Sequence, residues 1–430
     1  MNTPVWDFIE NYVNQKPVRL HMPGHKGQGQ LEEYDLTEVE GADVLYHATG
    51  ILKQSMENAA AIFGSGKTVY SAEGASLAIR AMVYLAKLHG GRIAAARNAH
   101  STFVTAAALL DVPVDWLYGD SLLSCQLTPE ALEEHLLKNP VGAVYVTSPD
   151  YLGNVADIRG LAEVCHRHNA LLLVDNAHGA YLGVLGRHPL QLGADLCCDS
   201  AHKTLPVLTG GAYLHIGKNA PQVFYNQAEK AMALFASTSP SYLILASLDK
   251  ANKYLAEAME QELQAFIPEI KKLKEKLEQK GFTLVGDEPI KLTLAPKSYG
   301  YRGTELATLL KAENMVCEFA DPDYLVLMVT PRNAKEDLLK LESFLLALPR
   351  KAAIAEKPPA MTKAETAMSM HQAIMQPAAT VPAEACLGKV LASPTVSCPP
   401  AIPVLVCGEV VNENALEQMR YYGIKELNVL

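Results

Sequence analysis

The chain has 430 residues, nearly half of them hydrophobic and one fifth charged, with a formal net charge of −10. This length allows two or three domains with a substantial core, and the composition is that of an ordinary globular protein. The acidic balance argues against a general nucleic-acid surface, which needs a basic stripe, and mildly favours a cationic small molecule through electrostatic steering.

The compartment is predicted from features that the sequence lacks. No stretch of eighteen apolar residues exists, so no membrane span is expected. Residues 1–10 lack the basic start and apolar core of a signal peptide. The eight cysteines show no Cys-x-x-Cys spacing, and Cys197 and Cys198 lie in an apolar run that predicts buried thiols rather than ligands. We therefore expect a reducing, cytoplasmic protein without a metal site.

Residues 1–60 are predicted to form an N-terminal arm. Four apolar side chains have the spacing of a short amphipathic helix, namely Val5, Phe8, Ile9 and Tyr12. The stretch His21-Met22-Pro23-Gly24-His25-Lys26-Gly27 then forms a turn set by Pro-Gly. This turn is either a solvated loop or, because two histidines surround it, part of a pocket lining.

From about Ser55 the hydrophobic pattern alternates between strands and helices. The runs predicted as strands are 68–71, 92–96, 141–147 and 170–175. The runs with helical spacing are 56–63, 77–88, a run through Leu110, and 158–168. Repeated strand-then-helix units with apolar strands predict an α/β fold whose mostly parallel central sheet is covered on both faces. In such sheets the chemistry collects at the carboxyl ends of the strands.

Polar residues follow three of these predicted strands. The tight turn Glu73-Gly74-Ala75-Ser76 lies between a strand and a helix, a geometry that places backbone amides against an anion, and Ser76 would add a hydroxyl. The alternative is an ordinary turn with a serine cap. His100 follows the next strand, and Asp175 ends a third, with His178 three residues later.

The stretch Ser200-Ala201-His202-Lys203-Thr204-Leu205-Pro206 supplies a lysine near these groups in the predicted sheet. A lysine that forms a Schiff base with pyridoxal phosphate (PLP) needs a phosphate site and an acid for the pyridine nitrogen. Asp175 would keep that nitrogen protonated, and His100 has a flat ring that can stack on the cofactor. Singly, these residues are equally a loop lysine, a helix cap and a structural histidine. Their joint order along the chain predicts a PLP enzyme.

The second half of the chain is predicted to contain smaller units. The polar segment Ser237-Thr238-Ser239-Pro240 precedes a long helix over 242–280. A smaller α/β unit follows, with elements at 291–295, 304–313, 324–330 and 335–348. Residues 350–365 read as a linker. The predicted division is an arm (1–60), a PLP-binding large domain (61–255), a small α/β domain (256–352) and a small C-terminal domain (366–430).

Over nearly its whole length the chain resembles a short-form member of the Orn/Lys/Arg decarboxylase family, PLP enzymes of the aspartate-aminotransferase fold. Besides the arm and the lysine stretch quoted above, the resemblance rests on Asp35-Leu36-Thr37-Glu38, Arg97-Asn98-Ala99-His100, Asp175-Asn176-Ala177-His178-Gly179-Ala180, Thr238-Ser239-Pro240-Ser241-Tyr242 and the Pro-rich segment up to Gly408-Glu409.

The resemblance implies a role for each motif residue. Lys203 is the Schiff-base lysine, Asp175 the partner of the pyridine nitrogen and His100 the stacking ring. The catalytic set is completed by His178 and His202. The cofactor-binding set also contains Gly74, Ala75, Ser76, Ala177 and Ser200, and Thr238 is expected to reach the phosphate of a neighbouring protomer. A homodimer with shared active sites is therefore implied.

Several positions depart from the family pattern. Glu73 and Ala75 replace Asn and Thr in the phosphate turn, Asn176 stands where an acid is common, and Gly210 stands where Gln is common. In the C-terminal segment, Ala401 and Cys407 replace Gly and Pro. An anion beside the phosphate turn is unfavourable unless the Glu73 side chain points away.

The leading hypothesis is PLP-dependent decarboxylation of arginine, lysine or ornithine to agmatine, cadaverine or putrescine, in polyamine biosynthesis. The large inducible members carry an extra N-terminal domain that this sequence lacks, so their decamers are not expected. One alternative is another PLP reaction, such as transamination or an aldolase-type cleavage, with Arg332 as a candidate for the substrate carboxylate. A third hypothesis is a catalytically idle regulatory protein. The sequence does not rank the three substrates.

Overall fold

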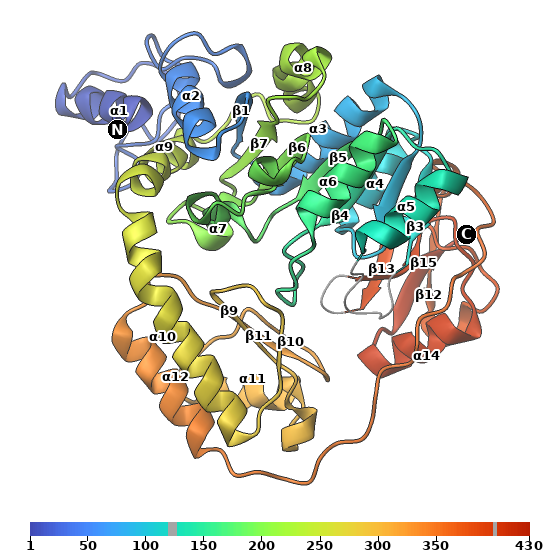
Figure 1. Cartoon of the computed structure of the whole chain (residues 1–430). Coiled ribbons are helices and arrows are strands. Elements are labelled where there is room, and N and C mark those ends of the chain that lie inside the picture. Colours follow the sequence, from blue (N-terminus) through green and yellow to red (C-terminus); the bar gives the residue numbers. More distant parts are fainter. Residues whose placement is uncertain (119–126, 399–401) are drawn as a thin grey trace. The chain divides into compact units, whose positions relative to one another are not determined.

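The computed structural model describes residues 1–118, 127–398 and 402–430 (Figure 1). The chain divides into two compact units, each described by itself below. The first comprises Met1–Ile93, Thr128–Ser148 and Asp157–Gln261, and the second Ala94–Leu127, Pro149–Ala156 and Glu262–Leu430. The predicted four-part division stays a prediction.

The first unit contains five neighbouring sheet strands in the order β1-β7-β6-β5-β4. β4, β5 and β6 are parallel, whereas β7 is antiparallel to both β6 and β1. The strands are β1 (Lys67–Ser71), β4 (Ala143–Thr147), β5 (Leu171–Asp175), β6 (Leu196–Asp199) and β7 (Ala212–Ile216). The helices are α1 (Pro4–Asn14), α2 (Ile51–Phe63), α3 (Gly74–His89), α5 (Pro129–Lys138), α6 (Ile158–Arg167), α7 (Ala201–Thr204), α8 (Gln222–Ala233) and α9 (Tyr242–Glu257).

The centre of this sheet is buried on both faces, as the apolar strand runs predict. Every residue of β5, β6 and β7 is buried. Asp175, the last residue of β5, lies opposite Cys198 of β6. The carboxyl ends of these strands therefore bring polar residues to one edge of the sheet. Cys197 and Cys198 are the predicted buried thiols, and burial raises the pKa of both.

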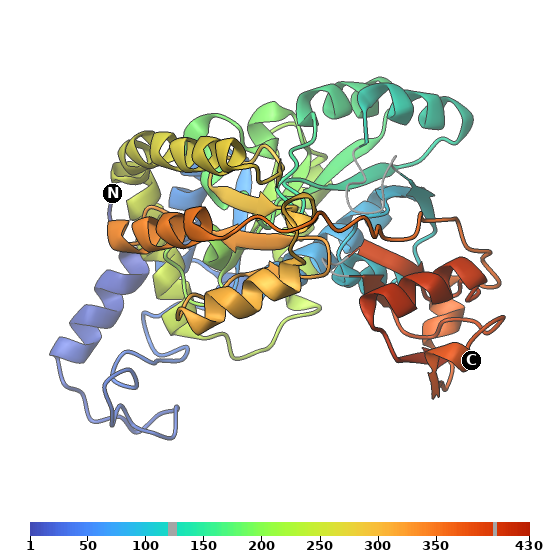
Figure 2. The ribbon, with the colours of Figure 1, turned by 90° about the horizontal axis from the view of Figure 1, so that it is seen from below.

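The second unit contains neighbouring strands β2 (Ile93–Ala96, which it shares from Ala94 on) and β3 (Val114–Leu117), and an antiparallel sheet in the order β10-β11-β9-β8. Its other elements are α4 (Ser101–Leu109), α10 (Met259–Lys280, from Glu262 on), β8 (Leu284–Val285), β9 (Lys291–Leu294), α11 (Gly303–Ala312), β10 (Phe319–Ala320), β11 (Leu325–Met328) and α12 (Lys335–Ala347). α10 and α12 run side by side (Figures 1 and 2), and Lys276 of α10 binds Glu342 of α12 at 2.5 Å.

The C-terminal part of this unit has its own small strands and a hydrophobic cluster. β12 (Ala379–Pro382) pairs with β15 (Glu426–Val429), and β13 (Thr395–Cys398) with β14 (Ile402–Val406). The helices are α13 (Met370–Ile374) and α14 (Glu413–Tyr422). Buried residues such as Leu391, Leu405 and Met419 form the cluster. Within the described residues, no helix is long and apolar enough to cross a membrane.

The predicted helix over 242–280 is wrong at one point, because the structure has two helices there. Ala258 leaves the helical conformation, with φ −134° and ψ −35°, between α9 and α10. α9 buries Leu248, Ala251 and Leu255, whereas α10 buries a separate apolar stripe along its own length. Tertiary packing thus overrides the good helix propensity of alanine.

The first helix begins at a buried carboxylate supplied by α9. The backbone N–H groups of Val5 and Trp6 donate to Asp249 Oδ2 at 3.0 and 3.1 Å, and Ser55 Oγ donates to Oδ1 at 2.5 Å. Asp249 is fully buried, and burial raises its pKa to about 6. This carboxylate satisfies N–H groups that every helix start leaves without an internal partner.

Asp249→Ala is expected to destabilise the first unit by about 2 kcal/mol, because it leaves buried N–H groups and a buried hydroxyl without an acceptor. Thermal unfolding measures the loss. Lys253→Ala on the exposed face of the same helix is the control and should change little. Equal stability of the two variants would contradict the tertiary cap.

Candidate active site

Lys203 lies in α7, the short helix that directly follows β6. Its Nζ is 3.1 Å from His178 Nε2. His178 is buried in the turn after β5, whereas Lys203 is half-buried. The structure therefore brings together two residues of the predicted set that lie 25 positions apart in the sequence.

Asp175 is a buried carboxylate surrounded by donors. The hydroxyl of Tyr145 donates to its Oδ2 at 3.0 Å, and the Ala177 N–H donates to its Oδ1 at 3.1 Å. The Cys198 thiol lies 3.6 Å from Oδ1. Burial, together with the nearby Asp175 charge, raises the pKa of Tyr145 well above its ordinary value, so its hydroxyl stays protonated and donates. Each carboxylate oxygen of Asp175 therefore accepts a hydrogen bond at the end of β5. Sequence analysis missed Tyr145, which lies on the neighbouring strand β4.

The predicted phosphate turn is the start of α3. Gly74 has φ +74°, and a Cβ added there would meet nothing within 4 Å. Glu73, the N-cap residue, makes no side-chain cap. The helix therefore begins beside open space, with Ala75 and Ser76 in its first turn. A helix start of this kind suits an anion, because its backbone N–H groups and its dipole favour negative charge.

Gly210 and Gly211 connect this turn to the lysine helix. The Gly74 N–H donates to Gly210 O at 2.6 Å. The His202 N–H and Nδ1 lie 3.3 and 3.2 Å from Gly211 O. Ser200 Oγ lies 3.4 Å from His202 Nδ1. The turn and His202 are thus both bonded to one short segment before β7, and Ser200 contacts His202.

The structure explains three departures from the family pattern. A Cβ at Gly210, whose φ is +101°, would lie 2.9 Å from the Ala72 carbonyl oxygen, so glutamine does not fit this conformation. Asn176 Nδ2 donates to Asp199 Oδ1 at 2.7 Å, where an acid would face a second carboxylate. Glu73 is exposed and accepts the Ser237 N–H at 2.7 Å.

A second cluster of buried polar side chains is centred on Asp199, the last residue of β6. His188 Nε2 and His215 Nε2 lie 2.9 and 3.2 Å from Asp199 Oδ2, and all three residues are fully buried. Burial alone would raise the pKa of Asp199, but the two histidines hold it below its ordinary value. One ring nitrogen of each histidine and one carboxylate oxygen of Asp199 lie within 4.8 Å of one another, a spacing that could hold a metal ion. However, the Leu190 N–H donates to His188 Nδ1 at 3.4 Å, so His188 carries its proton on Nε2 and directs it at Asp199. This arrangement is that of a hydrogen-bond network.

His100 belongs to the second unit. It is the N-cap of α4, where its Nδ1 accepts the Thr102 N–H at 3.2 Å, and its side chain is exposed. The sequence signal for His100 was a polar residue after a predicted strand. In the structure this residue does begin a helix. The predicted stacking role stays a prediction.

Thr238 is exposed and lines a cavity of about 400 Å³ in the first unit. Met22 and Pro23 of the N-terminal arm also line it, as do Asp35 and Glu38. The arm therefore contributes to a cavity wall, but not through its histidines. His21 lies 2.5 Å from the Tyr12 hydroxyl and His25 lies 3.2 Å from Asp35 Oδ2, so both rings hold the arm in shape. The C-terminal segment Pro399-Pro400-Ala401 lies outside the described residues.

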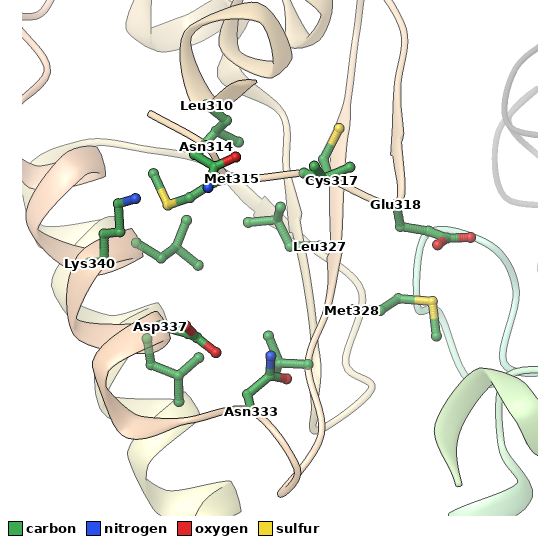
Figure 3. A pocket seen from close by; sticks show the side chains of 14 residues that line it. Leu310, Asn314, Met315, Cys317, Glu318, Leu327, Met328, Asn333, Asp337 and Lys340 are labelled. Atoms are coloured by element: carbon green, nitrogen blue, oxygen red, sulfur yellow. The ribbon is translucent and has the colours of Figure 1, made fainter. Parts of the chain in front are cut away.

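A larger cavity, of about 570 Å³, lies in the second unit between α12, β11 and residues 314–318 (Figure 3). Its lining mixes apolar and polar side chains, with Leu327 on the strand side and Asp337 and Lys340 on α12. It contains none of the predicted site residues. The candidate active site is therefore the set of residues that follow β1, β5 and β6, which carry the helix start, the acid and the lysine in that order.

The fold and this site define a PLP-dependent enzyme of the aminotransferase type. The constitutive lysine decarboxylase of E. coli has the same fold, with a TM-score of 0.81 at 17% identity over 100% of this chain and 82% of that one. The family model described as "Orn/Lys/Arg decarboxylase, major domain" matches residues 3–288. The chain belongs to the Orn/Lys/Arg decarboxylase family.

Among curated relatives, the arginine decarboxylase of Bacillus subtilis is 27% identical over 96% of this chain and 91% of its own length. That of Halalkalibacterium halodurans is 28% identical over 97% and 93%.

Family membership makes this chain a PLP-dependent amino-acid decarboxylase, and the residues present fit the cofactor. The donor-rich Asp175 suits a pyridine nitrogen, and at Gly74, where α3 begins, a Cβ would meet nothing within 4 Å. Among the described residues, the buried Asn176 Oδ1 and Thr204 Oγ1 have no hydrogen-bond partner. Asn176 follows Asp175 in the chain, and Thr204 follows Lys203.

Tyr145→Phe tests the acid side of this site. Removing the hydroxyl takes one donor from a buried carboxylate, so PLP is expected to dissociate about tenfold more readily. Equilibrium dialysis of the cofactor measures this change. Tyr225→Phe, which removes a hydroxyl that donates to Gly217 O at 2.6 Å, is the matched control. Equal cofactor affinity of the two variants would contradict the role given to Tyr145.

Proposed function

We propose that this chain decarboxylates arginine to agmatine, with Lys203 as the cofactor-binding lysine. The observation that carries the proposal is the Lys203–His178 contact of 3.1 Å beside the donor-rich Asp175. The choice of arginine is supported by curated arginine decarboxylases that match over more than nine tenths of their length. The negative net charge agrees with a cationic substrate.

The residues of the chain divide the chemistry among them. PLP, when bound, supplies an electron sink for the bond that loses carbon dioxide. Asp175, backed by Tyr145, would keep a positive charge on the ring nitrogen. The first turn of α3, with Ser76 and Ser200, would hold the phosphate. His178 Nε2, 3.1 Å from the Lys203 amine, would take or return a proton there.

Transamination gains no support from the structure. Arg332, the candidate for holding a substrate carboxylate, is more than half exposed and lies 4.0 Å from Glu262. An arginine that fixes a substrate carboxylate acts through a bidentate contact in a sheltered site. The surface position of Arg332 does not provide one.

Lys203→Ala is expected to abolish amine production, because no other group replaces its amine at the cofactor. Released carbon dioxide and the amine product are measured with arginine, lysine and ornithine in turn. The visible absorption band of the bound cofactor should also disappear. Lys218→Ala, on an exposed loop, is the control. Turnover by Lys203→Ala would overturn the proposal, and a preference for lysine or ornithine would overturn the choice of substrate.

We further propose a cytoplasmic homodimer in which Thr238 completes the phosphate site of the partner protomer. Thr238 is exposed on a cavity wall, so it is accessible to a second chain. The neighbouring Ser237 N–H donates to Glu73 of its own chain at 2.7 Å, which fixes the backbone of this segment. A phosphate carries close to two charges and needs several donors, while the turn at Ala75 lacks the usual hydroxyl.

Mixing Lys203→Ala chains with Thr238→Ala chains tests this sharing. A mixed dimer has one site that combines an intact Lys203 with an intact Thr238, so about a quarter of the wild-type activity should return on mixing. Light scattering and mass spectrometry confirm that mixed dimers form. If they form without recovery, Thr238 serves its own chain or no site at all.

A further inference from the structure

Asn176 joins the carboxyl ends of β5 and β6 through both its backbone and its side chain. Its N–H donates to Cys198 O at 2.9 Å, and its Nδ2 donates to Asp199 Oδ1 at 2.7 Å. Asn176 and Asp199 are both fully buried. The residue that follows Asp175 is therefore bonded to the last two residues of β6.

The carbonyl group of Asn176 closes the turn that carries His178. The Gly179 N–H donates to Asn176 O at 2.8 Å, so Ala177 and His178 are the two central residues of a hydrogen-bonded turn. The Asn176 side chain also packs against this turn, because a Cβ added to Gly179 would lie 2.0 Å from Asn176 Oδ1. A side chain at position 179 would therefore displace the Asn176 amide.

The other partner of this hydrogen bond, Asp199, leads directly to Lys203. Ser200, the residue after Asp199, is the N-cap of α7, and the Lys203 N–H donates to Ser200 O at 3.0 Å. His178 Nε2 then lies 3.1 Å from Lys203 Nζ. The two short segments that follow β5 and β6 thus meet twice, once at the Asn176–Asp199 hydrogen bond and once at the lysine amine.

Asp199 offers a fixed acceptor for this hydrogen bond. His188 and His215 contact its Oδ2, while its Oδ1 faces Asn176, and Cys197 Sγ lies 3.6 Å from Oδ1. A carboxylate that is held by several buried partners has one well-defined geometry. An amide suits position 176 because it donates a hydrogen bond without adding a second negative charge.

We infer that the Asn176–Asp199 hydrogen bond sets the turn at residues 176–179 and so positions the His178 ring at the Lys203 amine. The inference rests on the proposed role of His178 in moving a proton at that amine. Proton transfer needs hydrogen-bond distance, so a small displacement of the ring removes the effect of His178. Asn176 and Asp199 act through His178 and are positioning residues.

Asn176→Ala removes the amide that bonds Asp199. It is expected to lower kcat about tenfold while KM for the amino acid stays within about twofold, because proton transfer, not substrate binding, is disturbed. Gly179→Ala should give the same pattern and serves if Asn176→Ala does not fold. Gly179 has φ −120°, so alanine fits the backbone there and acts by displacing the Asn176 amide. An unchanged kcat in both variants would overturn the inference.

Asn252→Ala is the matched control, because Asn252 is also a fully buried asparagine of the first unit. It lies on α9, where its Nδ2 donates to the Tyr70 hydroxyl at 2.6 Å and its Oδ1 accepts from the Tyr213 hydroxyl at 3.2 Å. Its removal should lower thermal stability at least as much as Asn176→Ala and leave kcat unchanged. A loss of kcat equal to that of Asn176→Ala would show general destabilisation and overturn the inference.

A double-mutant cycle with His178→Ala identifies the residue through which Asn176 acts. If that residue is His178, Asn176→Ala causes no further loss of kcat in the His178→Ala protein. Losses that add in full would overturn the inference. If His178→Ala alone leaves kcat unchanged, the proposed role of His178 fails, and the inference fails with it. That outcome differs from additivity, so the two failures are distinguishable.

A measurement without cofactor completes the test. Hydrogen exchange of the backbone N–H groups of residues 177–179 in the PLP-free protein should rise severalfold in Asn176→Ala, because the turn loses the side chain that fixes it. Asn252→Ala should leave this exchange unchanged. Equal exchange of the turn in the two variants would overturn the inference.

Discussion

The parallel pairing of β5 with β6 is the constraint on which the proposed site depends. In this register Asp175 lies opposite Cys198. Cys198 in turn precedes Ser200 by two residues and Lys203 by five. Because parallel strands end at the same edge of a sheet, the acid and the lysine emerge together without a long loop. His178 then reaches Lys203 from the turn that follows β5. A shift of one residue in this pairing would point the Asp175 side chain to the opposite face.

Three buried carboxylates, two in the first unit and one in the second, are each surrounded by donors. Asp175 accepts from Tyr145 and the Ala177 N–H. Asp199 contacts Asn176 and two histidines. Glu409 accepts from Arg97 and the Val406 N–H. A buried charge without such partners would be strongly unfavourable, so each cluster has one well-defined geometry.

The sequence was sufficient to predict the elements that carry the candidate site, because these depend on local pattern. The apolar run of β5, which ends in Asp175, is typical of a strand buried on both faces, and such a strand shows no alternation. The partners of the buried carboxylates were not predictable in this way. Tyr145 is 30 residues from Asp175, and His188 is 11 residues from Asp199 on another element. Such contacts follow from strand order and packing. The break at Ala258 has the same origin, since nothing in its local sequence opposes a helix.

Two departures from the family pattern, Gly210 and Glu73, are both explained by their contacts near the start of α3. Gly210 lacks a side chain where a Cβ would press on the Ala72 carbonyl, and its own carbonyl accepts the Gly74 N–H. The Glu73 carboxylate accepts the Ser237 N–H, so its charge is directed at this backbone group and not at the predicted phosphate turn. These changes gather around the start of α3, whereas Lys203 and Asp175 keep the family pattern. In the proposed site they would therefore bear on how the phosphate of the cofactor is held, not on which bond is broken.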